Sequence, residues 1–147
     1  MQITKHPAKI LKKKLQPVGK ITPEIVALIA DMHATMVEAK GVGLAANQVG
    51  KDLQIFVIDK KLADENGVPD AYINPEITEY GKESDEMEEG CLSLPGTWLQ
   101  MKRPKKVKLK ALDESGKKIK LKARGFLARV FQHEYDHLCG ILIKNRV

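Results

Sequence analysis

Two histidines four residues apart near the carboxyl end, His133 and His137, constrain the fold of this chain more than any other feature. Residues i and i+4 lie one turn apart on the same face of an α-helix, so the two imidazoles could bind one metal ion. Glu134 points roughly 100° away around such a helix, where its carboxylate could accept a proton from a metal-bound water. The alternative is a solvent-facing helix whose histidines are four apart by chance. Because the whole chain has only four histidines, we favour the metal site.

The site needs a third ligand, because catalytic zinc-type sites usually combine three protein ligands with one open position. The ten residues after His137 contain no His, Asp or Glu, and Cys139 points about 200° away from His137 around the helix. The third ligand must therefore come from upstream, where Cys91 follows Gly90 in a predicted bend or strand end. We favour the Cys91 thiolate as this ligand over a buried, inert cysteine.

The segment 41–50, Gly-Val-Gly-Leu-Ala-Ala-Asn-Gln-Val-Gly, is a second candidate for the site. Its glycines and small residues allow the backbone to approach another group closely. Gln48 offers amide donors from a constrained loop, which would suit a developing oxyanion. A plain helix end followed by a turn is the alternative, and this stretch by itself favours the alternative.

A helix is predicted from Thr22-Pro23-Glu24 to about Lys40. It would begin with an N-cap hydroxyl, a proline at the first helical position and an acid in the first turn. The apolar residues of this helix repeat at helical spacing and should face the core. They are Ile25, Ile29, Met32 and Met36, with Val26 and Val37 beside them.

Apolar runs predict buried strands at 54–59 and 71–74, and the second is expected to stop at Pro75. The polar segment 63–70 between them, with Asn66-Gly67 and a proline, predicts a loop.

Two charged segments follow. The acidic stretch 83–89 is interpreted as a solvated edge. Residues 105–112 and 117–123 alternate apolar side chains with lysines on either side of Asp113-Glu114-Ser115-Gly116. That alternation predicts a β-hairpin with one solvent-exposed face of lysines.

Composition sets broader limits. The 147 residues are expected to form one domain, and without an apolar run of 18 residues we expect no transmembrane helix. Two cysteines and no apolar export signal predict a cytoplasmic location. The net charge of +6 comes mostly from lysines, which we interpret as spread through the chain and forming a solvated surface. Such a charge could also attract a polyanion such as ribosomal RNA.

Three separated motifs resemble those of peptide deformylases, in matching order and similar spacing. They are Gly-Val-Gly-Leu-Ala-Ala-Asn-Gln at 41–48, Glu-Gly-Cys-Leu-Ser at 89–93 and Gln-His-Glu-Tyr-Asp-His-Leu at 132–138. The resemblance implies an α+β fold, with short mixed or antiparallel sheets around a central metal-binding helix that carries His-Glu-x-x-His. It also implies a metal-dependent hydrolase that removes the formyl group from the N-formylmethionine of new bacterial or organellar chains, by attack of a metal-bound water.

The resemblance also implies a role for each motif residue. One divalent metal ion is expected, Fe(II) natively, with Zn(II) and Ni(II) as alternatives. Glu134 matches the general base, while Gln48 and the Leu92 backbone N–H match the donors to the formyl oxygen. The other implied residues are Cys91, His133 and His137 as metal ligands, Val42 and Gly43 along the substrate main chain, and Arg129 and Val130 around the methionine side chain.

The implied partners are a nascent formyl-Met peptide and, transiently, the ribosome, with no membrane and no specific nucleic acid. Trp98 stands where family members often have arginine, and Asn145 replaces a frequent aspartate. Asp136 is expected to form a salt bridge and not to bind the metal. Two other functions stay open. One is a zinc endopeptidase with a third ligand other than Cys91, and the other is a non-enzymatic basic protein that binds RNA or the ribosome.

Overall fold

The computed structural model describes residues 1–146, which form an α+β fold. The α-helices of this part of the chain are α1 (Pro23–Glu38), α2 (Lys60–Asn66) and α3 (Gly125–Leu138), and the 3₁₀ helices are η1 (Lys9–Lys12), η2 (Ala46–Val49) and η3 (Ile143–Asn145). The strands are β1 (Gly43–Ala45), β2 (Ile55–Ile58), β3 (Ala71–Tyr80), β4 (Ser84–Cys91), β5 (Leu94–Pro104), β6 (Lys106–Leu112) and β7 (Lys118–Arg124).

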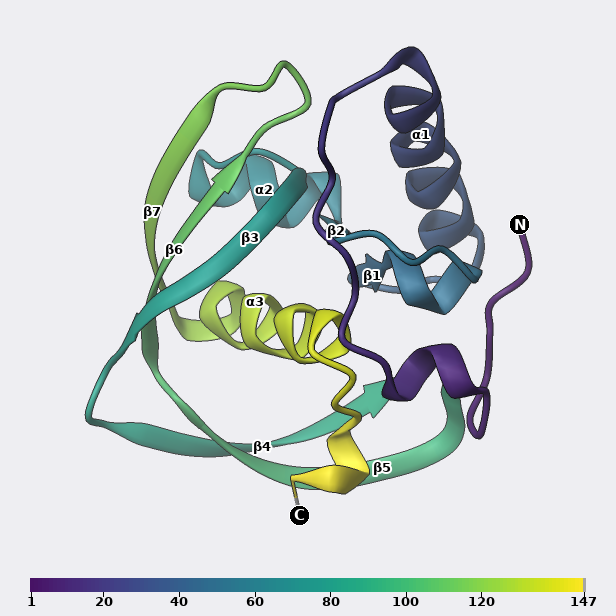
Figure 1. The fold of residues 1–147 in the computed structure, drawn as a ribbon. Coiled ribbons are helices and arrows are strands. Elements are labelled where there is room, and N and C mark those ends of the chain that lie inside the picture. The colour runs from purple at the N-terminus through teal and green to yellow at the C-terminus, as the bar shows by residue number, and fades with distance from the viewer. Residues whose placement is uncertain (147) are drawn as a thin grey trace.

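The strands form two separate sheets, and α3 lies between them (Figure 1). The larger sheet has the order β1-β2-β3-β6-β7, and β4 and β5 form a two-stranded ribbon. Every strand pair described within residues 1–146 is antiparallel. α3 contacts β5 of the ribbon as well as strands of the larger sheet. Within the same residues, no helix combines the length and hydropathy that crossing a bilayer requires.

Helix α1 begins as predicted. The Thr22 hydroxyl accepts a hydrogen bond from the Ile25 amide at 3.3 Å, and Pro23 occupies the first turn. The residues Ile29, Met32 and Met36 are buried in the core. The expectation for Val26 and Val37 was wrong, since they are 43% and 66% exposed. Each follows a core-facing residue by one position, and a step of about 100° turns it away from the core.

Strand β3 does not stop at Pro75 as expected, but continues to Tyr80. The register shifts between Ile73 and Glu76, where Asn74 has a φ of 51°. The Asn74 side chain hydrogen-bonds both the amide and the carbonyl of Val18, at 2.7 and 2.9 Å. Pro75 therefore lies in a β-bulge, where its missing N–H costs the sheet no ladder hydrogen bond.

The predicted loop at 63–70 was wrong in its first half, which belongs to α2. Asp59 accepts a hydrogen bond from the Leu62 amide at 3.4 Å and caps the helix start. Gly67 ends the helix with a φ of 63°. The spacing between Asp59 and Gly67 is the signal that could have revealed this short helix.

The hairpin was predicted correctly, and its inward residues Val107, Leu109 and Ala111 are buried. On the larger sheet, Phe56 and Tyr72 stack with ring centroids 4.9 Å apart. Both rings pack on Phe131 of α3, at 5.9 and 5.0 Å. Aromatic packing therefore fixes α3 against this sheet.

We predict that Gly140→Ala destabilises the fold more than Gly67→Ala. Both glycines have positive φ, 77° and 63°, which costs an L-residue about 1–2 kcal/mol. A Cβ at Gly140 would also lie 2.6 Å from the carbonyl carbon and oxygen of Lys12, whereas nothing lies within 4 Å at Gly67. Urea unfolding of the two variants measures the difference, and equal losses would show that the contact of Gly140 with η1 is unimportant.

Candidate active site

Three side chains that could bind a metal meet at one point between α3 and the end of β4. The ligand atoms of Cys91, His133 and His137 all lie within 4.8 Å of one another. The Cys91 sulfur is 3.3 Å from His137 Nε2. The two imidazoles lie one helical turn apart, with centroids separated by 5.0 Å. The fold therefore brings together the residues that the sequence suggested as ligands, although Cys91 lies 42 or more positions before the two histidines in the sequence.

The ring of His133 is held by Glu89. His133 Nδ1 lies 3.1 Å from Glu89 Oε1, which leaves Nε2 directed toward the other two side chains. A carboxylate on the far nitrogen is the usual support of a metal-binding histidine, since it fixes the tautomer and the ring orientation. Burial opposes ionisation of Glu89, but hydrogen bonds from His133 and Arg103 outweigh burial and lower the pKa of Glu89 to about 2.

The expectation that 83–89 is a solvated edge was wrong at Glu89, which is only 7% exposed. Sequence reasoning missed it because it lies among exposed acidic residues. A signal existed, because Glu89 and Cys91 are two positions apart and so share one face of a strand.

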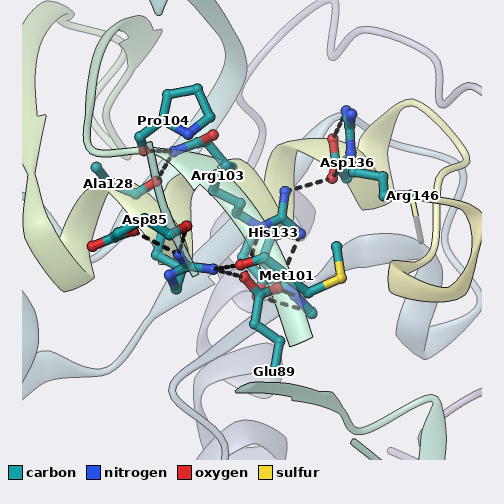
Figure 2. Close-up of polar contacts among 12 residues, drawn as sticks. Asp85, Glu89, Met101, Arg103, Pro104, Ala128, His133, Asp136 and Arg146 are labelled. Carbon is teal, nitrogen blue, oxygen red and sulfur yellow. Dashed lines mark hydrogen bonds and ion pairs between the residues drawn. The ribbon is translucent and has the colours of Figure 1, made fainter. Parts of the chain in front are cut away.

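A buried network of charges extends from Glu89 (Figure 2). The guanidinium of Arg103, 3% exposed, donates to Glu89 at 2.7 and 3.0 Å and to Asp136 at 2.9 Å. Asp136 also accepts two hydrogen bonds from Arg146, each of 2.6 Å. Asp136 thus forms salt bridges, as expected, and Arg103 is a second supporting residue that the sequence did not reveal.

Arg129 borders the site but does not offer it a free charge. Its guanidinium donates to Glu89, to the Met101 carbonyl at 3.1 Å and to Asp85 at 2.8 Å. It is 6% exposed. Its charge is therefore paired within the protein, and only the remaining surface of its side chain borders the cavity.

The electrostatics of the site fit a bound cation. Burial lowers the pKa of His133, but the Cys91 sulfur, the Glu134 charge and the Glu89 hydrogen bond raise it to about 10. The surroundings of His133 thus stabilise positive charge. Burial and the charge of His133 lower the pKa of His137 well below 6.5, so its ring is a neutral donor. A thiolate, two imidazoles and an anionic second layer suit a divalent metal.

Glu134 lies beside this group without belonging to it. Its Oε2 is 4.0 Å from His133 Nε2, and its Oε1 is buried with no hydrogen-bond partner within residues 1–146. Burial raises the pKa of Glu134 to about 7, against the opposing charges of His133 and Arg103. A Cβ at Gly43 would lie 2.6 Å from Glu134 Oε2. The close backbone approach expected of the segment 41–50 is therefore the packing of Gly43 on this carboxylate.

Gln48 on η2 is buried and its amide is fixed. Its Oε1 accepts a hydrogen bond from the Ala45 amide at 2.9 Å. Its Nε2 consequently faces the Cys91 sulfur at 3.7 Å and the Ser93 hydroxyl at 3.2 Å. The amide donor of Gln48 therefore lies next to Cys91, one of the three clustered side chains. The segment 41–50 is thus more than the plain helix end and turn that we considered as the alternative.

Several of these groups border one cavity of about 460 Å³, although His137, Arg103 and Asp136 are not among its lining residues. Cys91, His133 and Glu134 border it together with Gln48 and Leu92. The apolar residues of its border include Val130, which is 4% exposed, and four partly exposed residues. These four are Val42, Met87, Trp98 and Phe126.

The comparisons with known proteins agree on one family. The family model described as Polypeptide deformylase matches residues 1–147. The peptide deformylase of Prochlorococcus marinus (strain MIT 9312) is 44% identical over 147 residues, all of this chain and 73% of that protein. The peptide deformylase of Thermodesulfovibrio yellowstonii is also 44% identical over 147 residues, all of this chain and 88% of that protein.

Solved structures are similar over the whole fold. The Thermotoga maritima peptide deformylase has a TM-score of 0.92 at 40% identity, covering 99% of this chain and 96% of that one. An Acinetobacter baumannii peptide deformylase with bound Met-Ala-Ser has a TM-score of 0.90 at 35% identity, covering 100% of this chain and 98% of that one. From the family match, these relatives and the shared fold, we conclude that the chain belongs to the polypeptide deformylase family of hydrolytic enzymes.

Proposed function

We propose that this chain removes the formyl group from the N-terminal formylmethionine of new polypeptides, with one divalent metal held by Cys91, His133 and His137. The observation that carries the proposal is the meeting of these three ligand atoms within 4.8 Å, beside a cavity that Cys91 and His133 line together with Glu134 and Gln48. A metal bound there would supply positive charge to polarise the formyl carbonyl and would acidify water. One thiolate and two imidazoles suit Fe(II) as well as Zn(II) or Ni(II).

Glu134 is proposed as the general base. A buried carboxylate with a pKa raised to about 7 is matched to proton transfer near neutral pH. Water adds to the formyl carbon while Glu134 accepts its proton. When the C–N bond breaks, the same carboxyl group returns the proton to the amine nitrogen. Formate and a peptide with a free amino terminus are the products.

Gln48 and the Leu92 backbone are proposed to stabilise the oxygen on which negative charge develops. The Gln48 amide is already oriented by the Ala45 amide, at 2.9 Å, so little reorganisation is needed during the reaction. The backbone of Val42 and Gly43 would pair with the substrate main chain. Val130, with the packing surface of Arg129, would border the methionine side chain.

The two other functions receive less support. A zinc endopeptidase with a different third ligand is disfavoured by the position of Cys91 against His137. A purely structural metal is disfavoured because Glu134 and Gln48 border the same cavity as Cys91 and His133. We further propose that residues 1–147 form a single catalytic domain that works in the cytoplasm and meets the ribosome transiently.

We predict that Glu134→Gln keeps the metal and lowers catalysis by about two or more orders of magnitude, the usual contribution of a general base. Formate release from formyl-Met-Ala-Ser, with anaerobically loaded Fe(II) or with Ni(II), gives the rate. Metal analysis of the same samples gives the occupancy. Loss of metal together with activity would instead make Glu134 a ligand. Wild-type protein that never releases formate would defeat the proposed function.

Cys91→Ala is expected to lose the metal, whereas Cys139→Ala is the matched control. Cys139 caps the end of α3 and lies outside the ligand group. The loss of affinity at Cys91 should exceed the roughly 10–100-fold that removal of an outer-shell partner costs. Chelator competition measures both variants. Full metal content in Cys91→Ala would revive the endopeptidase hypothesis.

Glu89→Gln is expected to weaken metal binding by roughly 10–100-fold, because the His133 ring loses its anionic support. The matched control is Glu88→Gln, one position away and exposed on the other face of β4. Circular dichroism establishes that each variant is folded before chelator competition is measured. The same affinity in both variants would show that Glu89 supports the fold and not the ligand.

A further inference from the structure

Lysines occur throughout the sequence, as expected, but the net positive charge of the chain is concentrated on one β-hairpin. Residues 105–124 carry nine basic and two acidic residues, a net charge of +7, whereas the whole chain carries +6. The other 127 residues carry 16 basic and 17 acidic residues, a net charge of −1. The hairpin of β6 and β7 therefore accounts for the entire excess of positive charge.

The basic side chains of this hairpin share one face. Side chains alternate along a strand, and the alternate positions Val107, Leu109 and Ala111 are buried. The basic positions between them, and those on β7, are exposed. We call this surface the basic face, and it consists of Lys106, Lys108, Lys110, Lys118, Lys120, Lys122 and Arg124.

The basic face sets like charges against one another. In the register of the hairpin, Lys106 is opposite Arg124, Lys108 is opposite Lys122, and Lys110 is opposite Lys120. Like charges directly opposite across two strands destabilise a sheet. The chain keeps this arrangement on three successive pairs. An oppositely charged partner bound across these pairs would offset the repulsion.

Acidic neighbours neutralise only one side of the basic face. Glu79 and Glu76 of β3 pair with Lys108 and Lys110, at 3.0 and 3.3 Å. Within residues 1–146, no acidic group lies within 4.0 Å of the basic groups of Lys106 or of the four basic residues on β7. β7 is an edge strand (Figure 1). Lysines on an edge discourage pairing with another chain, but this does not explain the opposing charges on β6.

A hollow of about 410 Å³ opens beside the basic face. It is lined by four basic residues, Lys106, Lys108, Lys122 and Arg124, and by one acidic residue, Glu79, which pairs with Lys108. Arg124 immediately precedes α3, and Phe126 two residues later borders the active-site cavity. One end of the basic face is therefore two residues along the chain from a residue that borders the cavity. On β4, by contrast, the exposed residues include Asp85, Glu86 and Glu88, which would repel a polyanion from the ribbon side.

We propose that the basic face binds the phosphate backbone of RNA without selecting its sequence. Alternate residues on a strand are about 6.7 Å apart, so the face presents two regular rows of positive charge to a regular row of phosphates. Lysine binds phosphate as a point charge. All seven members are lysine or arginine, so the face has no aromatic ring on which bases could stack. Recognition through phosphates alone follows, and it is separate from the hydrolytic activity.

The test uses the metal-loaded full chain and a fluorescein-labelled, single-stranded RNA of about 20 nucleotides and mixed sequence, a length that exceeds the site size of typical single-strand binders. Fluorescence anisotropy between 50 and 200 mM KCl gives the salt dependence of binding. Each phosphate contact on a single strand contributes about −0.7 to the slope of log K against log salt. The test variant combines Lys118→Gln, Lys120→Gln and Lys122→Gln. It should make the slope shallower by about 2, and it should weaken RNA binding at least tenfold at low salt.

The triple substitution removes facing like charges, so the fold should be at least as stable, which thermal unfolding verifies. None of the three residues borders the active-site cavity, and formate release from formyl-Met-Ala-Ser should be unchanged. Replacing the same three lysines by arginine should restore RNA binding. Failure of formate release in the wild type would concern the proposed function alone.

The matched control combines Lys9→Gln, Lys12→Gln and Lys14→Gln, which remove the same charge from exposed positions in the N-terminal segment. This control should bind RNA like the wild type. An equal loss in the control would show that net charge alone attracts RNA, and the proposal would be wrong. It would also be wrong if the wild type does not bind at 50 mM KCl. Displacement of the RNA by polyglutamate at equal charge concentration would instead assign the face to an acidic protein.

Discussion

The carboxylate of Glu89 is the group on which the site depends, because its hydrogen bonds with His133 and Arg103 connect three elements that are distant in the sequence. Glu89 comes from β4, its partner Arg103 from β5, and His133 from α3. Buried charges are costly unless each finds a partner. Here Arg103 lies between Glu89 and Asp136, and each carboxylate receives more than one hydrogen bond. Displacing any member would leave a charge uncompensated, so the network specifies one position for the helix relative to the ribbon.

Helix α3 is thus held on two sides by different kinds of contact, apolar packing on one side and charged hydrogen bonds on the other. Toward the larger sheet, Phe131 packs on Phe56 and Tyr72. This contact is apolar and tolerates small shifts of the helix. Toward the ribbon, charged hydrogen bonds with strict geometry hold the ring of His133 and the carboxylate of Asp136. Apolar packing places the helix, and the ionic contacts then orient the groups that face Cys91.

Local patterns predicted the local parts of this structure. The spacing of His133 and His137 located α3, and alternation located the hairpin of β6 and β7, because these periods follow directly from backbone geometry. The α+β class followed from the resemblance. Non-local features were not predictable in this way. Pro75 was taken as a stop because the bulge that accommodates it depends on hydrogen bonds between the Asn74 side chain and the backbone of Val18, 56 residues away. Glu89 was taken as solvated because Arg103 becomes its partner only when β4 pairs with β5.

Trp98 gives the cavity a property unrelated to its chemistry. It is the only tryptophan of the chain, it is 65% exposed, and it pairs with Gly90, next to Cys91. Its ring packs directly on Gly90, where a Cβ would lie 2.5 Å from a ring carbon. The indole is therefore seated on backbone at the cavity border, with one face toward solvent. The wavelength of its fluorescence emission would shift when a bound peptide covers that face and changes the polarity around the indole. Intrinsic tryptophan fluorescence could therefore report peptide binding without an added dye and without turnover.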